Sequence, residues 1–263
     1  MNEVQVGSWA ELQEAVFADS WDPDIGRFRL KCAFRGLSDV AYRLETALMR
    51  LGGNYAGIEY QLLRSFRKYA PRSGAERESV WHWISLAQHS GLPTRLMDWT
   101  YSPFVAMHFA TANLARYDVD GAIWAVNIAK AHQLLPGRLR RGLEQEGADA
   151  FTVTMLSDSI RSLEELGDVS KDDVVLFFEP PALDERVVNQ YALHSMMTNP
   201  ATPLDDWLRA QPDLWRKIVI PSTLKWEVRD KLDQANITER VLFPGLNGLS
   251  RWLRRYYTPS TAT

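Results

Sequence analysis

The chain has 263 residues, of which 46% are hydrophobic and 24% are charged. These values are typical of a globular protein that can bury a sizeable core, and they exclude a fibrous repeat or a globally disordered chain. The formal net charge of -3 argues against a general polyanion binder, which is usually basic, but it leaves room for a local basic cleft.

The elements of the first half follow from helix caps and hydrophobic periodicity. Ser8 and Glu11 form a capping-box pattern that opens an amphipathic helix ending near residue 18. Apolar and basic side chains alternate over residues 27–35, which predicts a half-buried strand that Gly36 breaks. Further on, the pattern predicts helices at 58–69, 75–90 and 102–115, a short strand at 94–100 and a buried strand at 121–128.

The second half continues to mix helices and strands. Residues 130–170 are expected to be helical and polar, and residues 187–197 extended or turning. Strands are predicted at 173–178 and 215–220, and helices at 222–234 and 249–256. Because no linker, repeat or shift in composition divides the chain, one mixed α+β domain is the simplest arrangement.

Standard motifs of nucleotide and metal chemistry do not occur in the sequence. It has no GxGxxG, Walker A, HExxH, CxxC or GxSxG pattern, and its histidines lack metal-ligand spacing, so we expect no metal cofactor. The single cysteine, Cys32, cannot form an internal disulfide, which fits a reducing compartment. The chain starts without a signal-peptide pattern and has no apolar stretch of membrane-spanning length, so we expect a cytoplasmic protein with no membrane partner.

Two places combine polar side chains with a turn. Arg35 stands at the end of the expected strand beside Gly36, where its guanidinium can fork onto a phosphate or a carboxylate. Polar residues are dense over 88–100, between a helix end and a strand, and buried polar groups need partners. Arg95 and Asp98 can satisfy each other as a buried pair, or a ligand can satisfy them, and the residues leave both interpretations open.

Several segments resemble the FRG domain family, which is named for its (F/Y)RG motif. The triplet Phe34-Arg35-Gly36 carries that motif, and the stretch LAQHSGLPTRLMDWTYSPFVAMHFA over residues 86–110 resembles the family's central motif. The resemblance implies an FRG domain over residues 28–257, preceded by a helical lead-in at 1–27 and followed by a frayed tail at 258–263. Members of the family are often associated with bacterial anti-phage or toxin-like contexts.

The order of parts is also similar to the ADP-ribosyltransferase superfamily, whose members bind NAD in a cleft between two small sheets. This second resemblance implies two small, mostly antiparallel sheets that flank a cleft and are covered by helices. Arg35 ends the early strand, Asp98 and Thr100 precede a helix with small residues, and Gln190 stands near the place of the family's late glutamate.

The resemblance assigns roles in cleaving the nicotinamide–ribose bond of NAD, which passes through an oxocarbenium-like state. Arginines would hold the phosphates, a carboxylate would stabilise the cation, and a histidine would take a proton from the acceptor. The expected NAD-binding residues are Arg35, Gly36, Gln88, Thr94, Arg95 and Thr100. The expected catalytic residues are Asp98, His89, Gln190 and Arg186.

The leading hypothesis is therefore an ADP-ribosyltransferase-like enzyme that uses NAD as co-substrate and modifies RNA, DNA or a protein, as a bacterial toxin or anti-phage effector with a cognate antitoxin as a further partner. One alternative is a nucleotide-binding sensor or regulatory module without turnover. A second is a metal-dependent nuclease-like toxin, for which Asp98, Glu59 and Glu179 would supply carboxylates. A third is a plain interaction scaffold.

Overall fold

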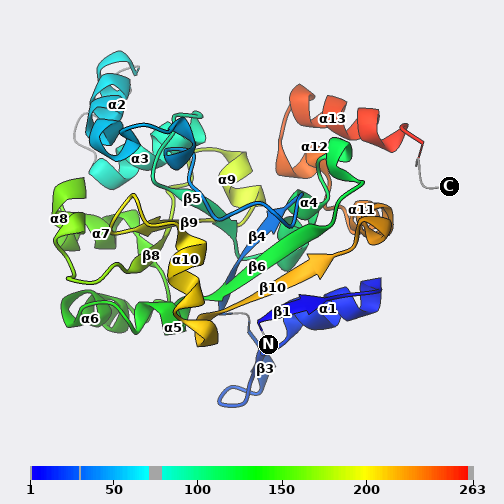
Figure 1. Ribbon diagram of the computed structural model, residues 1–263, viewed down its shortest axis with the longest axis horizontal. Helices are drawn as coiled ribbons and strands as arrows, with labels where there is room; N and C mark the ends of the chain where they lie inside the picture. The colour runs from blue at the N-terminus through cyan, green and yellow to red at the C-terminus, as the bar shows by residue number, and fades with distance from the viewer. Residues whose placement is uncertain (1, 30, 71–78, 260–263) are drawn as a thin grey trace.

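A single mixed sheet runs through the protein, whose structure is a computed structural model describing residues 2–29, 31–70 and 79–259 (Figure 1). The strand order is β1-β10-β6-β4-β5-β9-β8-β7. These strands are β1 (Glu3–Gln5), β4 (Cys32–Leu37), β5 (Met97–Thr100), β6 (Gly121–Asn127), β7 (Phe151–Thr152), β8 (Val175–Glu179), β9 (Ala192–Met197) and β10 (Trp215–Ile220). Neighbours are antiparallel except at the two ends, where β1 pairs with β10 and β7 with β8 in parallel. A separate small hairpin joins β2 (Trp21–Asp22) and β3 (Arg27–Phe28).

Helices surround this sheet. They are α1 (Trp9–Phe17), α2 (Tyr55–Tyr69), α3 (Val80–His89), α4 (Pro103–Ala110), α5 (Ile128–His132), α6 (Gly137–Glu146), α7 (Val153–Ser159), α8 (Leu163–Gly167), α9 (Glu185–Asn189), α10 (Leu204–Arg209), α11 (Lys225–Gln234), α12 (Glu239–Leu242) and α13 (Leu246–Tyr256). Short 3₁₀ helices lie at Met49–Leu51, Leu114–Arg116, Pro212–Leu214 and Ser222–Leu224. Figure 1 shows α5 to α8 near the β7–β8 end of the sheet, and α1 and α11 near the β1–β10 end. None of the helices in the described ranges is long and apolar enough to cross a bilayer.

The sheet is nearly interrupted between β4 and β5. These two strands pair only at Phe34 and Thr100, whereas β4 pairs with β6 at every position of Cys32–Leu37 and β5 pairs with β9 at every position of Met97–Thr100. One register pair therefore joins two half-sheets, β1-β10-β6-β4 and β5-β9-β8-β7. The expected α+β class is correct, but the two separate small sheets are corrected to one sheet with a weak junction.

Helix caps account for the elements that were predicted most closely. The Ser8 hydroxyl accepts a hydrogen bond from the Glu11 amide at 3.2 Å, and α1 starts at the next residue as expected. The Ser102 hydroxyl accepts from the Val105 amide at 3.3 Å, which opens α4 with a proline in its first turn. Strand β10 also occupies the predicted residues 215–220.

Other predicted elements were wrong in their boundaries. The expected strand at 27–35 divides into β3 and β4, and Gly36 does not end it, because Gly36 pairs with Ile123 inside β4. The segment 187–197 was expected to be extended or turning; residues 187–189 belong to α9 and residues 192–197 form β9. The short helix α10 was not anticipated. The predicted apolar position Leu30, the start of the predicted helix 75–90 and the end of the predicted tail (260–263) lie outside the described residues.

Close packing of α4 on β4 explains the glycine of the Phe-Arg-Gly motif. A Cβ at Gly36 would lie 1.9 Å from the carbonyl oxygen of Ala106 and 2.6 Å from the amide nitrogen of Ala110. Only a residue without a side chain lets the helix backbone come this near to the strand. Phe34 is fully buried in the core beside this contact, together with other side chains from α1, α4 and α11.

Candidate functional site

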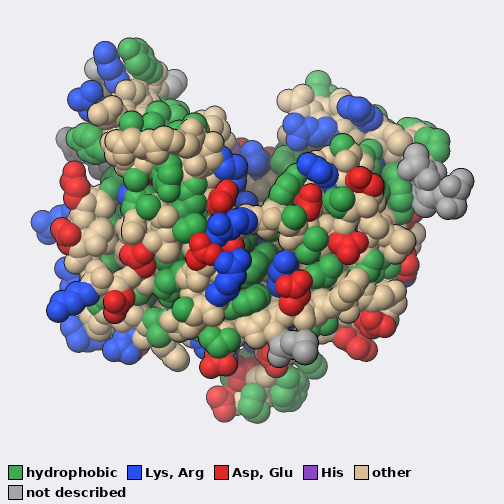
Figure 2. All heavy atoms as spheres, in the orientation of Figure 1, with side chains coloured by type: hydrophobic (Ala, Val, Ile, Leu, Met, Phe, Trp, Pro, Cys, Tyr) green, Lys and Arg blue, Asp and Glu red, His purple; other side chains and the backbone are tan. Residues whose placement is uncertain are grey.

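A cavity of about 220 Å³ opens where β4 and β5 separate. Apolar parts of its wall come from Phe34, Trp99, Phe109, Pro180, Leu183, Val187 and Ala192. Its polar lining consists of Arg35, Ser85, Gln88, His89, Asp98, Thr100, Arg186, Gln190 and His194, and Gly36 contributes as well. The cavity therefore brings together all the expected site residues except Thr94 and Arg95. Figure 2 shows the molecule notched between the lobe that carries α2 and α3 and the lobe that carries α12 and α13.

Arg35 spans the gap between the two strands. Its Nη1 donates a hydrogen bond to the main-chain carbonyl of Asp98. That carbonyl gains a side-chain donor where β4 and β5 no longer form ladder bonds. The Arg35 Nε is buried and has no hydrogen-bond partner. Burial lowers the pKa of Arg35, opposed by the charge of Asp98, but a guanidinium keeps its proton in proteins. The cavity wall thus holds a positive charge with an unused donor.

The Asp98 carboxylate belongs to the lining of the cavity. Its Oδ1 lies 3.2 Å from Nδ1 of His194 and accepts a hydrogen bond from Nε2 of Gln88 at 3.1 Å. The side chain is 60% exposed, although the hollow surrounds it with protein atoms. That desolvation raises the pKa of Asp98, but the hydrogen bond and charge of His194 and the charge of Arg35 hold the pKa well below its usual range. Asp98 is therefore ionised at neutral pH and open to a ligand.

Thr94 acts on the cavity through Gln88 rather than by lining it. The buried Thr94 hydroxyl donates to Oε1 of Gln88 at 2.6 Å and accepts from the Leu96 amide at 3.1 Å. Because the Gln88 oxygen is occupied, its amide nitrogen is the group that faces Asp98. Thr94 was expected to contact the cofactor, and the structure instead places it behind Gln88.

A second histidine–carboxylate pair lies on the cavity wall. Nε2 of His89 lies 2.9 Å from Oδ2 of Asp184. The other oxygen of Asp184 accepts from the Val187 amide at 3.1 Å and caps α9. The helix cap thus fixes the carboxylate, and the carboxylate orients the imidazole, which is the arrangement of a general base.

Arg95 lies outside the cavity. Its Nε donates to both carboxylate oxygens of Glu59 at 2.9 Å, and its Nη1 donates to the Thr198 carbonyl at 3.2 Å. Both members of the ion pair are buried. The considered pairing of Arg95 with Asp98 is therefore wrong, and the expected role of Arg95 in holding NAD phosphates finds no geometric support.

Two expected residues line the cavity with side chains that already have partners. The Thr100 hydroxyl donates to the main-chain carbonyl of Gln190 at 2.7 Å and accepts from the Ser102 amide at 3.0 Å. The Gln190 amide nitrogen donates to the Leu242 carbonyl at 2.8 Å. Both residues tie β5 and the end of α9 to neighbouring segments, so their first effect is to shape the cavity.

The carboxylates proposed for a nuclease-like metal site do not converge. Glu59 is paired with Arg95, and Glu179 accepts a hydrogen bond from the Tyr101 hydroxyl at 3.1 Å. Within the described parts of the chain, no three histidine, cysteine or carboxylate side chains gather into a metal-binding group. The geometry gives the nuclease alternative no support.

His194 is the site residue that sequence reasoning did not single out. It lies directly opposite Asp98 in the β5–β9 register, and only 7% of it is exposed. The available signal was a histidine within the apolar run Ala-Leu-His-Ser-Met-Met of residues 192–197. Its partner follows only from the strand register, which the sequence does not reveal.

Comparison with known proteins bears on the segment that builds this cavity. No curated protein and no solved structure is significantly similar to the chain. Residues 30–118 match the FRG domain family, and this range contains β4, α3, β5 and α4, from which Arg35, His89 and Asp98 reach the cavity. This match confirms, over residues 30–118, the resemblance that the Phe-Arg-Gly triplet and the central motif carry.

Proposed function

We propose that the protein cleaves the nicotinamide–ribose bond of NAD in this cavity and transfers the ADP-ribosyl group to a nucleic-acid or protein acceptor. The observation that carries the proposal is the ionised carboxylate of Asp98 in the cavity lining, held by His194 and Gln88 and open to a ligand. A fixed negative charge in a hollow is the group that a developing ribosyl cation needs.

The chemistry balances with the groups present. The bond between ribose C1′ and the nicotinamide nitrogen breaks, its electron pair leaves with neutral nicotinamide, and Asp98 faces the resulting cation. An acceptor hydroxyl or amine then attacks C1′ and loses its proton to His89, whose imidazole is oriented by Asp184 at 2.9 Å. Phe109, Leu183 and Val187 line the cavity, are partly exposed, and offer an apolar wall for the nicotinamide ring.

The cavity is small for a whole dinucleotide. Pockets for drug-sized ligands span roughly 300–1,000 Å³, and this cavity has about 220 Å³. Only the nicotinamide–ribose end would be enclosed, which is the end at which the bond breaks. The rest of the molecule would extend outward past Arg186.

The test is to incubate the protein with NAD labelled in its adenylate, together with cell lysate and total RNA. We expect free nicotinamide to appear and the label to move onto RNA or protein. Asp98→Asn should slow the reaction by about 100-fold or more. Asp172→Asn is a matched control, because Asp172 is an exposed carboxylate outside the cavity. Nicotinamide release by Asp98→Asn at the wild-type rate would refute the role of Asp98.

One observation favours a sensor that binds the nucleotide without turnover. The resemblance to ADP-ribosyltransferases sets Gln190 near the place of their late glutamate, and the Gln190 amide nitrogen donates to the Leu242 carbonyl. Gln190→Glu would place a carboxylate next to the Leu242 carbonyl. A higher rate of nicotinamide release in this variant would require the substituted side chain to turn into the cavity. Tight NAD binding with no nicotinamide release in the wild type would establish the sensor in place of the transferase.

A further inference from the structure

A second, wider hollow lies directly outside the cavity. It has a volume of about 600 Å³ and is lined by Asp184, Glu185, Arg186, Phe243, Pro244, Asn247 and Arg251. We call this hollow the outer basin. Arg186 lines both the cavity and the outer basin. The two hollows therefore adjoin at Arg186.

Two guanidinium groups meet at one aromatic ring in the outer basin. The Cζ atoms of Arg186 and Arg251 lie 5.2 Å and 5.5 Å from the ring centroid of Phe243. Neither guanidinium forms a hydrogen bond or ion pair with any other described residue. Stacking on the ring holds each group by its face and leaves its N–H donors free at the edge. Two guanidinium groups without ion-pair partners among the described residues thus face one hollow.

The carboxylates of the basin do not neutralise this pair. Asp184 is committed to His89 and to the α9 amide that it caps. Glu185 lines the basin, but it does not approach Arg186 or Arg251 within ion-pair distance. The basin therefore keeps its two cationic groups available for an anion.

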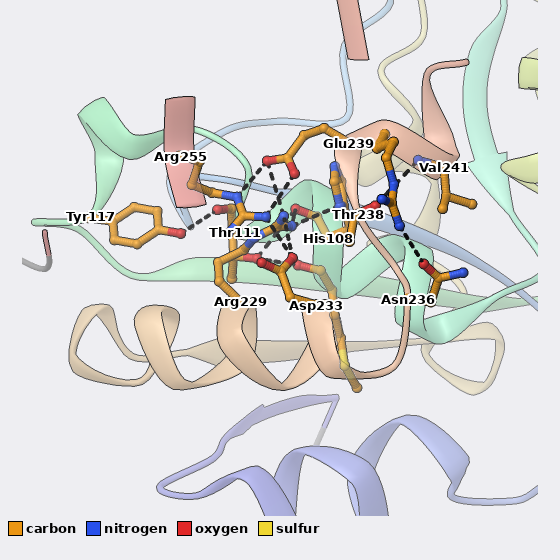
Figure 3. A network of polar contacts seen from close by, with 12 residues as sticks. His108, Thr111, Tyr117, Arg229, Asp233, Asn236, Thr238, Glu239, Val241 and Arg255 are labelled. Atoms are coloured by element: carbon orange, nitrogen blue, oxygen red, sulfur yellow. Dashed lines mark hydrogen bonds and ion pairs between the residues drawn. The ribbon is translucent and has the colours of Figure 1, made fainter. Parts of the chain in front are cut away.

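A buried ionic network holds in place the side of the outer basin that Phe243 and Arg251 line, which we call the far wall (Figure 3). Arg255 of α13 donates to Glu239 at 2.7 Å and to Asp233 at 2.6 Å, and fully buried Arg229 lies 3.1 Å from Glu239. Arg229 also contacts Nδ1 of His108 on α4 at 2.8 Å. These contacts tie α12 and α13 to α11 and α4, and so fix the elements that carry Phe243 and Arg251.

The side of the basin that Arg186 lines, the near wall, is joined to the far wall by hydrogen bonds from side chains to main-chain carbonyls in the last turn of α12. Asn189 donates to the Val241 carbonyl at 2.9 Å, and Gln190 donates to the Leu242 carbonyl at 2.8 Å. Because α9 carries Arg186 and Phe243 directly follows α12, these bonds hold the backbone of Arg186 close to Phe243. The pair is preorganised, which lowers the ordering cost of binding an anion.

We propose that the outer basin is a phosphate subsite, in which Arg186 and Arg251 bind the diphosphate of the nucleotide whose other end enters the cavity. The identity of that nucleotide as NAD rests on the proposed function, whereas the preference for a diphosphate rests on the basin alone. Two forked guanidinium groups suit two adjacent phosphates, and the Asn247 amide lines the same hollow as a further donor.

The test measures the binding of ADP and of inorganic pyrophosphate to the full chain by calorimetry. We expect both to bind the wild type, and Arg251→Ala and Arg186→Ala each to weaken binding about tenfold or more. Arg254→Ala is the matched control, because Arg254 is an exposed arginine of the same helix outside the basin.

The outcomes separate the two proposals. Failure of the wild type to bind ADP or pyrophosphate, or wild-type affinity in a folded Arg251→Ala or Arg186→Ala variant, would overturn the subsite. If ADP binding depends on both arginines but NAD binds no more tightly than ADP and releases no nicotinamide, the subsite stands and the proposed function fails. A melting curve of each variant establishes that the protein is folded. Either arginine variant alone suffices to accept or reject the phosphate subsite.

Discussion

Glu59→Ala should destabilise the protein severely, because it leaves the charge of Arg95 buried without a partner. The side chains of Arg95 and Glu59 are only 7% and 5% exposed, and Glu59 accepts the Arg95 Nε hydrogen bond on both oxygens at 2.9 Å. Removing one member of such a buried pair costs about 3–5 kcal/mol. In a chain of this size, that loss corresponds to a melting temperature lower by roughly 10 °C.

Urea unfolding at pH 7, followed by tryptophan fluorescence, gives the free energy of unfolding for Glu59→Ala, Arg95→Met and the double variant Glu59→Leu/Arg95→Met. The double variant should be more stable than the sum of the single costs predicts, because it leaves no unpaired charge. It should also bind NAD normally, because Arg95 lies outside the cavity. A cost below about 1 kcal/mol for Glu59→Ala, or additive costs, would refute the buried pair. Loss of NAD binding in a folded double variant would return Arg95 to the phosphate-binding role.

Three further predictions concern pH, packing and the strand junction. Burial and then the charge of Arg229 lower the pKa of His108 to about 3, and burial lowers that of His132 to about 4. As the pH falls below about 6.5, the histidines of the unfolded chain take up protons before those of the folded protein do. The free energy of unfolding, measured with urea, should therefore fall by about 2 kcal/mol per histidine between pH 7 and pH 5. A free energy that does not change with pH would contradict the burial of His108 and His132. Gly36→Ala should cost about 3 kcal/mol or more in thermal melting, whereas Gly142→Ala, which has open space around it, should be neutral or stabilising. Arg35→Ala should both weaken NAD binding and cost about 1–3 kcal/mol by orphaning the Asp98 carbonyl; an unchanged melting temperature would show that the carbonyl finds another donor.

Elements with local signals were predictable from the sequence. The hydroxyls of Ser8 and Ser102 and the proline after Ser102 act within one helical turn, so they locate the starts of α1 and α4 without knowledge of the rest of the fold. The apolar run of residues 215–220 likewise defines β10. Where the pattern was ambiguous, as at 187–197, a helix turn and a strand follow one another too closely for periodicity to separate them.

The chemistry of the site was predictable in part for the same reason. Gln88, His89, Asp98 and Thr100 are close in sequence, so the density of polar groups marked the region. Gly36 was singled out as a ligand contact and lines the cavity, and the close approach that requires a glycine there is that of the α4 backbone. A glycine signals close approach without naming what approaches.

The sequence by itself determined the class of the fold, the starts of α1 and α4 and which stretch of the chain holds the reactive polar groups, because caps, periodicity and local density need only near neighbours. Only the tertiary structure decided which of those groups share a cavity. Arg95 pairs with Glu59, 36 residues away in the chain, and Asp98 contacts His194, which lies opposite it in the register of β5 and β9. Partners at such separations are chosen by strand pairing and by the satisfaction of buried charge over the whole fold, which no local pattern encodes.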